Sequence, residues 1–377
     1  MKILMLTTNS SLMDGINRHI LAISIALNKI KNIDVAVCTV FPEGDLNKEL
    51  NKNNVKTFSL NANNGHELKI IPKYFKIIKT YNPDIIHIHV MSILERIVSA
   101  LFFKHIKYIK TIHGIDDKLM RIPIRMKLER FLNKLFNIKY SATLYISLGV
   151  KEALSNKEEI NTHIIYNAIK VDEQNTETYN LRGMIGADEK NFIIGTSCRI
   201  AKVKRPHIFT DIMCQILSKD MQTHAVIIGD GEKEIINECK NIVERYGVKR
   251  RFHWLGYRKD APELIKEFNC FLLTSISEGL PTSLLECMAM KVPFAFIEGN
   301  GGLKDIAKFN KTEGMFALCS LYENKDELVD KILDIIYDTD KSKEYVERAY
   351  MIADKYFNVK NIAIKLINIY ENILHIK

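Results

Sequence analysis

The segment from Ser275 to Pro293, SISEGLPTSLLECMAMKVP, holds the densest set of groups that could do chemistry. An apolar run typical of a buried strand ends just before it, and residues with helical spacing follow its polar loop. The first turn of a helix leaves backbone N–H groups without partners, so a helix that begins near Thr282 and Ser283 predicts an anion site. Gly279 lets a ligand approach the backbone closely, and Pro281 stiffens the entry to the helix.

Two carboxylates bracket this predicted helix start. Glu278 lies in the loop before it, and Glu286 lies in the second turn of the helix. Ionised carboxylates only accept hydrogen bonds, so a phosphate at the helix start leaves both of them to accept sugar hydroxyls on either side. On spacing alone, an equally good interpretation is that both glutamates cap or solvate the helix.

Two cations follow the first predicted strand of the second half of the chain, in the pattern Gly195-x3-Arg199-x4-Lys204. A helix is expected to begin at Pro206, so the cations stand between a strand end and a helix start. Arginine can grip a phosphate with two parallel hydrogen bonds, and lysine adds a point charge. The pattern indicates a second anion site, although two solvated cations explain it as well when it is taken alone.

Two glycine-containing turns supply weaker signals. Gly229 stands at a strand end in the turn Ile227-Ile228-Gly229-Asp230-Gly231, and Gly256 follows Trp254 at the end of another strand. Turns of this kind join strands to helices in many proteins. They could line a slot for a nucleotide base, but packing in the core is the better explanation of Trp254 by itself.

These motifs stand at strand ends in a chain that alternates strands with helices. In the first half, strands are expected at 2–7, 34–41, 55–60, 85–89, 108–113, 143–147 and 163–166, with helices at 17–30, 74–80 and 93–104. In the second half, strands are expected at 192–197, 223–228, 251–255, 270–274 and 293–297, with helices at 206–218, 232–246, 262–268, 283–290, 325–337 and 341–377. This alternation predicts an α/β protein with parallel, doubly wound sheets.

The alternation stops once, in a polar stretch without apolar periodicity. We predict an N-terminal Rossmann-like domain over 1–170, a linker over 171–187 and a C-terminal Rossmann-like domain over 188–357. The last helix, at about 358–377, follows a predicted break and is expected to cross back to the first domain. Ligands of open α/β sheets bind at the carboxyl ends of the strands, so two such halves that face each other make a cleft.

The basic excess of the chain is concentrated in one segment. The formal net charge is +9, and residues 101–140 contain ten Lys or Arg against three acids. Apolar residues are mixed with these cations over 118–140, which predicts either an amphipathic helix on an anionic membrane or an ordinary helix with a solvated basic face. Our hypothesis is peripheral binding to the inner face of a membrane. A nucleic-acid partner is not expected, because aromatic residues are not interleaved with the cations.

Sequence signals of secretion and membrane insertion are weak. The N-terminal KILMLTT turns polar too soon for a signal peptide, and no uncharged apolar run reaches the roughly 18 to 20 residues of a spanning helix. The seven cysteines are scattered without a C-x-x-C, which is typical of reduced thiols. We therefore expect a cytoplasmic protein that is soluble or peripherally attached.

Two motifs could suggest a metal ion, and neither is complete. Asp338-Thr339-Asp340 has a D-x-D pattern but stands after a C-terminal helix, so we assign it to a solvated helix terminus. His87 and His89 share one face of a strand, yet no third or fourth zinc ligand is signalled. We expect a structural or acceptor-side role for these histidines, and no metal.

As an ordered set, the motifs resemble the GT-B glycosyltransferases of family 4, which are built around a Glu-x7-Glu motif. The matching residues of the C-terminal half are Gly195, Arg199, Lys204, Gly229-Asp230-Gly231, Glu278-Gly279-x-Pro281, Glu286, Met288-Ala289 and Val292-Pro293. Those of the N-terminal half are Gly15, His19, Asp84-Ile85-Ile86-His87-x-His89, Thr111-x-His113-Gly114, Ser147 and Asn167. The resemblance covers nearly the whole chain, in the right order.

The resemblance implies a role for each group of residues. The donor diphosphate is expected at Gly15, Arg199, Lys204, Leu280, Pro281, Thr282 and Ser283. The donor sugar and ribose are expected at Glu278, Gly279 and Glu286, and the base beside Gly229, Trp254 and Gly256. His113 and Glu278 are the expected catalytic residues, with His19 and His89 on the acceptor side.

Four positions depart from the family pattern. Asp14 stands where a second glycine is common, and an acid beside a diphosphate is unfavourable unless it points away. Ala168 replaces a usual glycine after Asn167, and Asp305 replaces a usual glutamate. Lys291 replaces a glycine just past a helix end, where a left-handed backbone would cost about 1 kcal/mol.

The expected reaction follows from electrostatics and from the resemblance. Cleavage of a sugar–phosphate bond places charge on the leaving diphosphate, which Arg199, Lys204 and a helix dipole would stabilise. The resemblance implies retention by front-side attack, without a cofactor or a required metal. We expect transfer of a hexose or N-acetylhexosamine from a nucleotide sugar, UDP preferred, to a glycan or lipid-linked acceptor in cell-surface polysaccharide synthesis. A nucleotide-sugar epimerase on the same fold and a non-catalytic binder of acidic polymers are the alternatives.

Overall fold

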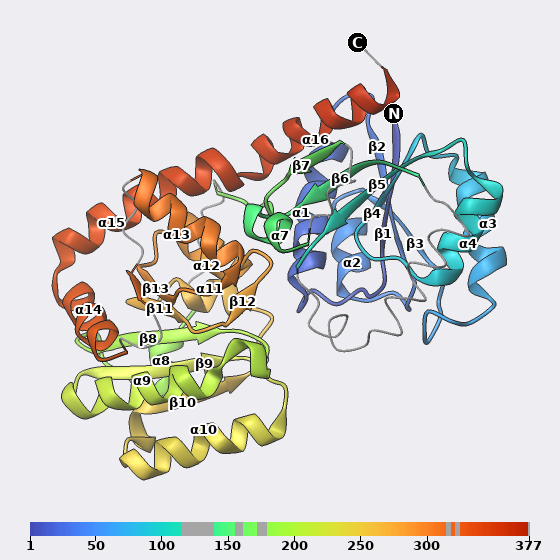
Figure 1. The fold of residues 1–377 in the computed structure, drawn as a ribbon. Helices are drawn as coiled ribbons and strands as arrows, with labels where there is room; N and C mark the ends of the chain where they lie inside the picture. The colour runs from blue at the N-terminus through green and yellow to red at the C-terminus, as the bar shows by residue number, and fades with distance from the viewer. Residues whose placement is uncertain (115–138, 155–160, 172–178, 314–317, 321–324, 376–377) are drawn as a thin grey trace. The chain divides into compact units, whose positions relative to one another are not determined.

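The chain divides into two compact units, each built on its own parallel sheet (Figure 1). The structure is a computed structural model that describes residues 1–114, 139–154, 161–171, 179–313, 318–320 and 325–375. Unit 1 comprises Met1–Ala168 and Val359–Lys377, and unit 2 comprises Ile169–Asn358. The predicted α/β class with two Rossmann-like sheets is confirmed.

Unit 1 contains a seven-stranded sheet in the order β3-β2-β1-β4-β5-β6-β7. Its strands are β1 (Lys2–Thr7), β2 (Asp34–Thr39), β3 (Lys56–Ser59), β4 (Ile85–Ile88), β5 (Lys107–Ile112), β6 (Tyr140–Tyr145) and β7 (Thr162–Ile164). All neighbouring pairs are parallel. The chain winds from β1 to one edge and then from β4 to the other, so a topological switch point lies at the carboxyl ends of β1 and β4.

Alternate residues of β1 enter two separate cores, one on each face of the sheet. Ile3 and Met5 belong to one core, and Leu4 and Leu6 belong to the other. The first core is completed by α1 (Gly15–Asn28), α2 (Asp45–Lys52) and α16 (Val359–Leu374), and the second by α3 (Ile70–Tyr81) and α4 (Ile93–Phe102). Successive strand residues point to opposite faces, which is why a strand covered on both faces is apolar throughout.

Unit 2 contains a six-stranded parallel sheet in the order β10-β9-β8-β11-β13-β15, and a separate two-stranded sheet, β12-β14. The strands are β8 (Phe192–Ser197), β9 (Thr223–Ile228), β10 (Phe252–Gly256), β11 (Cys270–Leu273), β12 (Ser277–Glu278), β13 (Phe294–Ile297), β14 (Asn300–Gly301) and β15 (Leu318–Ser320). The strand order reverses between β8 and β11, so the switch point of this sheet lies at the carboxyl ends of these two strands.

The helices of unit 2 follow its strands in alternation. They are α8 (Leu181–Ile185), η1 (Lys202–Lys204), α9 (Pro206–Lys219), α10 (Lys233–Tyr246), η2 (Lys249–Arg251), α11 (Ala261–Ile265), α12 (Thr282–Ala289), α13 (Gly302–Glu313), α14 (Lys325–Tyr337), α15 (Thr339–Ile352) and η4 (Ala353–Phe357). One apolar core joins α9 and α14 to the sheet. A further short helix, α7 (Leu148–Leu154), belongs to unit 1.

The last helix belongs to unit 1, although unit 2 precedes it in the chain (Figure 1). Asn358 has ψ near 127° and separates η4 from α16. Leu366 and Tyr370 of α16 are fully buried in the core that also contains Ile20 of α1. The predicted return of the C-terminal helix to the first domain is therefore confirmed.

One expectation about the elements needs correction. The predicted linker over 171–187 is wrong in its second half, because α8 buries Leu181 and Ile185 within unit 2. The backbone N–H of Leu181 also donates to Glu267 Oε1 at 2.9 Å. The helical stretch predicted over 341–377, with a break near 357–360, consists of α15, η4 and α16, and the break falls at Asn358.

Within the described ranges, no helix combines the length and the apolar composition that a membrane span requires. The six cysteines whose side chains are described are all free. Most of the basic amphipathic segment predicted over 118–140 lies outside the described residues.

Candidate active site

The carboxyl edge of the unit 2 sheet brings together the loops that follow β8 and β11. Arg205 connects these loops: its Nε donates to the carbonyl oxygen of Thr274 at 2.7 Å, and its Nη2 donates to that of Ser275 at 3.2 Å. In return, the Thr274 hydroxyl donates to the carbonyl oxygen of Lys204 at 3.1 Å. These bonds explain why the two loops stay together, and the left-handed backbone of Arg205 (φ 49°) is stabilised by them.

Lys204 and Glu278 form an ion pair at this edge. Lys204 Nζ lies 2.6 Å from Glu278 Oε1 and 2.7 Å from Oε2, so the ammonium donates to both carboxylate oxygens. The side chains are only 22% and 10% exposed, which strengthens their attraction relative to a surface pair. The structure thus brings together two residues that the resemblance assigns to different parts of one donor.

The helix that was expected to bind an anion begins directly after Glu278. α12 starts at Thr282 with Pro281 as its N-cap residue, and no described side chain caps it. Glu286 is half-buried and follows Thr282 and Ser283 by four and three residues, so it shares their face of the helix. An uncapped first turn therefore lies between two carboxylates, as the sequence predicts.

The two glycines of the turn after β9 are required by close backbone packing. Gly229 has φ 152°, and a Cβ atom there would lie 1.9 Å from the carbonyl oxygen of Cys198. Gly231 has φ 159°, and its Cβ would lie 2.1 Å from the carbonyl oxygen of Ile200. The same turn reaches β10, because the Gly229 N–H donates to the Gly256 carbonyl at 2.7 Å. Packing thus accounts for these glycines, and their place beside a nucleotide base stays a prediction.

Two further predicted residues lie on this edge. Trp254 of β10 is half-buried, with its ring centroid 6.0 Å from that of Phe252, and it packs against the unit 2 core. Arg199 follows β8, is exposed and forms no ion pair with another residue in the described ranges. Its guanidinium is therefore available to a ligand.

In unit 1, the loop after β1 is held by Asn17. This fully buried side chain accepts from the Thr7 hydroxyl at 3.0 Å and donates to the carbonyl oxygen of Ser11 at 2.9 Å. Asp14 is the N-cap of α1 and accepts from the Ile16 N–H at 3.0 Å. The acid that departs from the family pattern thus points at its own helix, and Gly15 is the first residue of that helix.

Four histidines of unit 1 form one cluster at the switch point of the sheet. The rings of His87 and His89 stack with centroids 4.4 Å apart. His19 of α1 lies edge-on to His89 and to His113, with centroids 5.7 and 5.8 Å apart. We refer to these four residues as the histidine cluster.

Hydrogen bonds divide the cluster into two rows: His87 forms the first, and His89 with His113 forms the second. His87 uses both ring nitrogens: Nδ1 lies 2.6 Å from the Tyr370 hydroxyl of α16, and Nε2 lies 2.6 Å from the Thr111 hydroxyl. His89 Nδ1 lies 2.8 Å from His113 Nε2. The second row therefore consists of two imidazoles bonded to each other.

Burial lowers the pKa of all four histidines. The pKa of His19 falls to about 4 and that of His87 to about 3, because burial penalises the charged imidazolium. The pKa values of His89 and His113 fall well below 6.5, first through burial and then through neighbouring imidazoles. The cluster is therefore neutral at pH 7. The Ala168 N–H donates to His19 Nδ1 at 3.0 Å, which places the proton of that neutral ring on Nε2.

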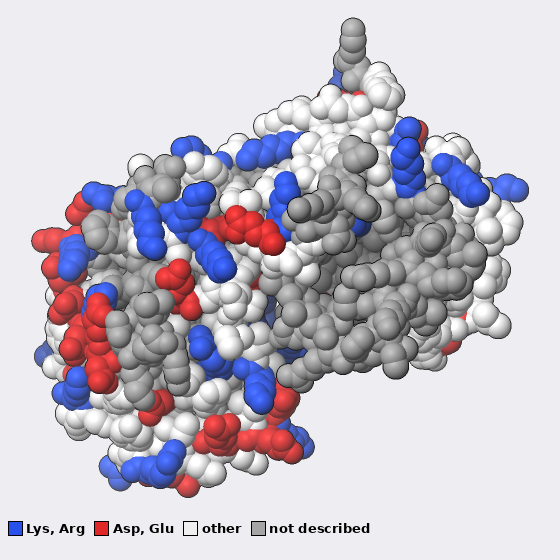
Figure 2. Space-filling view, viewed as in Figure 1, with Lys and Arg blue, Asp and Glu red and all other residues white. Residues whose placement is uncertain are grey.

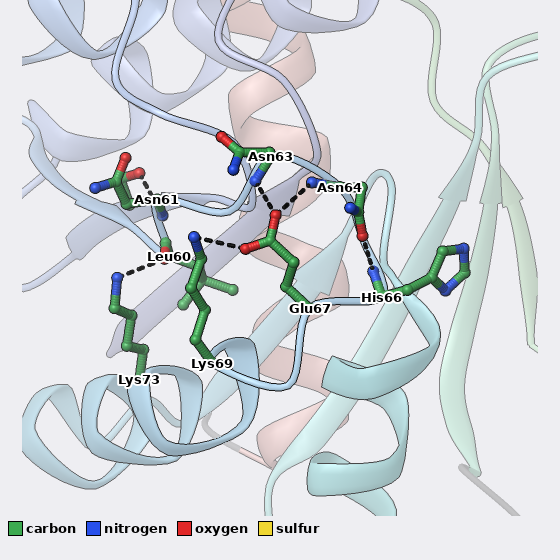
Figure 3. A network of polar contacts seen from close by, with 9 residues as sticks. Leu60, Asn61, Asn63, Asn64, His66, Glu67, Lys69 and Lys73 are labelled. Atoms are coloured by element: carbon green, nitrogen blue, oxygen red, sulfur yellow. Dashed lines mark hydrogen bonds and ion pairs between the residues drawn. The ribbon is translucent and has the colours of Figure 1, made fainter.

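A polar loop between β3 and α3 lies at the same edge of unit 1 (Figure 3). The Glu67 carboxylate accepts from the N–H groups of Asn63 and Asn64 at 2.6 and 3.1 Å and pairs with Lys69 at 2.5 Å. The bond from Lys69 is the main reason why the pKa of this half-buried carboxyl is lowered. These contacts order the loop by local bonds, and they do not involve the histidine cluster.

The D-x-D motif lies at a helix terminus, as the sequence predicts. The Asp338 carboxylate caps α15 by accepting from the Lys341 N–H at 3.0 Å. Asp340 is 93% exposed and pairs with Lys343. Figure 2 shows cations and acids interspersed over this face of unit 2, which agrees with a solvated surface.

Within each unit, the structure gathers most of the predicted site residues at one sheet edge. Sequence reasoning assigned no role to the residues that hold these edges together, which are Arg205, Thr274, Asn17, Thr111 and Tyr370. Only the position of Arg205, just before a helix-starting proline, gave a local signal of its role.

Two doubly wound parallel sheets in one chain, with the last helix returned to the first unit, define the GT-B class. The family model described as "Glycosyltransferase Family 4" matches residues 13–173, and the model described as "Glycosyl transferases group 1" matches residues 179–351. The chain belongs to the family 4 glycosyltransferases with the GT-B fold.

Sequence relatives and solved structures agree with this assignment. The chain is 22% identical over 255 residues to an uncharacterized glycosyltransferase of Methanocaldococcus jannaschii, covering 63% of this chain and 61% of the relative. It is 23% identical over 258 residues to the UDP-Gal:alpha-D-GlcNAc-diphosphoundecaprenol alpha-1,3-galactosyltransferase of Escherichia coli, covering 66% of each. The match thus spans somewhat less than two thirds of the length of these relatives.

The solved structures show the fold. Anabaena HepE in complex with UDP and glucose has a TM-score of 0.80 and 20% identity, covering 99% of this chain and 100% of that chain. A glycosyltransferase of Rickettsia africae has a TM-score of 0.79 and 20% identity, covering 99% and 98%.

Proposed function

We propose that this glycosyltransferase moves a hexose or N-acetylhexosamine from a nucleotide sugar, UDP preferred, to a glycan or lipid-linked acceptor in cell-surface polysaccharide synthesis. The observation that carries the proposal is the edge of unit 2, where the Lys204–Glu278 pair precedes the uncapped first turn of α12. Relatives support the class of substrate: the E. coli protein is a UDP-Gal-dependent galactosyltransferase, and a Staphylococcus aureus capsular polysaccharide glycosyltransferase is 23% identical.

Unit 2 is the proposed binder of the nucleotide sugar. The diphosphate is placed on the first turn of α12, from Leu280 to Ser283, with Arg199 adding charge. Lys204 has three donors, so it can bond a phosphate while one hydrogen bond to Glu278 remains. Phosphate binding would thereby release part of the Glu278 carboxylate for sugar hydroxyls, and Glu286 would take the ribose.

The proposed chemistry is electrostatic stabilisation of the leaving diphosphate. Arg199, Lys204 and the amides of α12 present fixed positive charge where negative charge develops. We include retention by front-side attack and independence of metal ions in the proposal, with Glu278 and His113 as the catalytic residues. Gly15, His19 and His89 of unit 1 are assigned to the donor phosphate and acceptor sides as the family resemblance implies.

A membrane surface is the proposed location of the acceptor, on the cytoplasmic side. The described start of the basic segment supports this: Leu101 and Phe102 are 54% and 57% exposed, and Lys104 follows them. Exposed apolar side chains beside cations favour anionic lipid surfaces. Co-sedimentation with anionic vesicles at low salt should recover the folded protein, and its absence from the pellet would remove this part of the proposal.

Thermal shift with nucleotides and nucleotide sugars tests the central proposal. A ligand at 100 times its dissociation constant should add about 2.7 kcal/mol to the free energy of unfolding. We expect a shift with UDP and UDP-sugars, and none with UDP for the Arg199→Ala, Lys204→Ala double variant. Lys341→Ala, a cation outside this edge, is the control and should respond as the wild type does. The absence of a shift for every nucleotide would overturn the proposal.

A further inference from the structure

Tyr370 is the one polar side chain among the residues that α16 buries in the described structure. Its ring is fully buried in the core of unit 1, where a phenylalanine would bury nearly the same apolar area. A buried hydroxyl is destabilising unless it has a hydrogen-bond partner, so its presence here needs an explanation. The partner is His87 Nδ1, which lies 2.6 Å away. The hydroxyl therefore serves this imidazole, and the packing of the helix does not require it.

The two hydroxyls that bond His87 differ in acidity, and this difference determines where the ring carries its proton. Burial lowers the pKa of His87 to about 3, so the ring is neutral at pH 7 and has one N–H and one lone pair. The Tyr370 and Thr111 hydroxyls lie 2.6 Å from Nδ1 and Nε2, respectively. A phenol is a stronger donor and a weaker acceptor than an aliphatic alcohol. Tyr370 therefore donates to Nδ1, and Nε2 carries the proton and donates to Thr111.

The ring plane of His89 depends on this bonded neighbour. The rings of His87 and His89 stack with centroids 4.4 Å apart and planes inclined by 29°. Among the described residues, His89 has one side-chain hydrogen bond, between its Nδ1 and His113 Nε2 at 2.8 Å, and its Nε2 has none. One hydrogen bond does not define the plane of a ring. The stacked face of His87 and the edge of His19 therefore hold His89 in its orientation.

We propose that Tyr370 is a positioning residue for His113: its hydroxyl fixes the proton and the ring plane of His87, the stack passes that orientation to His89, and the bond from His89 passes it to His113. This rests on the proposed function, in which His113 is a catalytic residue. The proposal gives the returned C-terminal helix a part in the reaction, because α16 supplies the hydroxyl. Tyr370 acts through the histidines and needs no contact with a substrate.

Nitrogen NMR of the full chain labelled with 15N-histidine tests this series of contacts without any ligand. The ring signals are assigned with His87→Asn and His113→Asn. At pH 7, His87 should be neutral with its proton on Nε2. Tyr370→Phe keeps the aromatic ring and removes the hydroxyl, and it should shift the signals of both His87 and His113. A proton on Nδ1 of His87, or unchanged His113 signals in Tyr370→Phe, would overturn the proposal.

Tyr74→Phe is the matched control for the loss of a buried hydroxyl. Tyr74 is also a fully buried tyrosine of unit 1, and its hydroxyl lies 3.1 Å from that of Ser99 in the core on the other face of the sheet. We expect both variants to lose stability in urea, but only Tyr370→Phe to move the His113 signals. An equal movement of those signals in Tyr74→Phe would show a general loosening of unit 1, and the positioning role would be wrong.

A double-variant cycle tests whether the effect passes through His87. His87→Phe keeps a ring to stack on His89, but it removes the nitrogen and leaves the Tyr370 hydroxyl without this partner. In that background, Tyr370→Phe should raise the stability in urea instead of lowering it. It should also leave the His113 signals where His87→Phe alone places them. A further movement of these signals would mean that α16 affects His113 without His87, contrary to the proposal.

Kinetics separates this inference from the proposed function. With the UDP-sugar that thermal shift identifies, kcat for UDP release should fall about tenfold in Tyr370→Phe with KM unchanged, because positioning acts on the reacting geometry. Tyr74→Phe should keep both constants. An unchanged kcat in Tyr370→Phe would contradict the inference while the proposed function stands. If no nucleotide sugar binds or reacts, the proposed function fails, and the NMR result still decides whether Tyr370 orients His113.

Discussion

The Lys204–Glu278 pair shows how a residue at this site can serve both stability and binding. Its two short contacts are largely shielded from water, so either charge would be left poorly solvated without the other. In the proposed function, a bound phosphate would supply a second anion to the same ammonium. The pair therefore keeps both side chains in place before any ligand arrives.

Removal of one charge of the Lys204–Glu278 pair should lower the free energy of unfolding more than removal of both charges. We expect Lys204→Met to lower the free energy of unfolding by about 1–3 kcal/mol, because Glu278 loses its charged hydrogen bonds. In the Lys204→Met background, Glu278→Gln should restore most of this stability, but it should not restore UDP binding. Urea unfolding and UDP thermal shift measure the two effects.

An exposed pair of the same type provides the control for this cycle. Lys343→Met removes the partner of Asp340, whose side chain is 93% exposed, and should change stability by less than about 0.5 kcal/mol. Equal losses in Lys204→Met and Lys343→Met would show that the pair at the site is no more than a surface contact.

At the scale of elements, the loops after β8, β9 and β11 are shaped by contacts between backbones. The Ile200 N–H donates to the Asp230 carbonyl, and the Glu232 N–H returns a bond to the Ile200 carbonyl, both at 2.9 Å. Gly229 and Gly231 permit the close approach of the loops after β8 and β9, and Arg205 joins the loops after β8 and β11. Lys291, after α12, adopts the left-handed backbone that the family pattern suggests for it (φ 57°).

Two glycines with positive φ should respond very differently to alanine. At Gly229 a methyl group would collide with the Cys198 carbonyl, whereas at Gly247, the residue after α10, nothing lies within 4 Å. We expect Gly247→Ala to cost about 1 kcal/mol from backbone strain alone, and Gly229→Ala to cost more because the loops must separate. Chemical unfolding of both variants gives the comparison. Similar losses would mean that the β8 and β9 loops are not in close contact.

At the scale of the whole molecule, unit 1 contains four buried neutral histidines in contact, and this makes its stability depend on pH. The titratable groups that face one another are His19 of α1, His87 and His89 at β4, His113 after β5 and Tyr370 of α16. The pKa of each histidine is lower in the folded chain than in the unfolded one. The unfolded chain therefore binds more protons as pH falls below 6.5.

The free energy of unfolding of unit 1 should thus be highest above pH 6.5 and fall steadily as pH is lowered toward 4. Glu95 opposes this trend, since burial raises its pKa to about 7, but it is one group against four. Circular dichroism in urea at several pH values measures the loss.

Unit 2 provides an internal reference for this pH effect. It contains Trp254, the single tryptophan, and its His224 and His253 have lowered pKa values but are less buried than the cluster. The unfolding transition of unit 2, monitored at this tryptophan, should shift less with pH than the unfolding transition of unit 1. A larger shift at the tryptophan would contradict the assignment of the effect to the cluster.

Much of this protein could be predicted from the sequence because the signals are local. Apolar runs such as Ile3–Leu6 and helical spacing indicate strands and helices, and glycine, proline and charged residues at strand ends indicate binding loops. The short helix α2 escaped prediction, because Leu46 and Leu50 are its only apolar residues and two residues define no period. The two-residue strands β12 and β14 carry no periodicity and form only by pairing with each other.

By itself, the amino-acid sequence determined the α/β class, the order of the two units along the chain and the set of residues at strand ends. These features depend on the periodicity of apolar residues and on turn residues, which act over a few neighbouring positions. Only the tertiary structure decided which of those residues meet. Lys204 and Glu278 are 74 residues apart, and His87 and Tyr370 are 283 apart. Their contacts depend on strand order and on where the last helix packs, and the bonds that satisfy buried polar atoms are set by that packing.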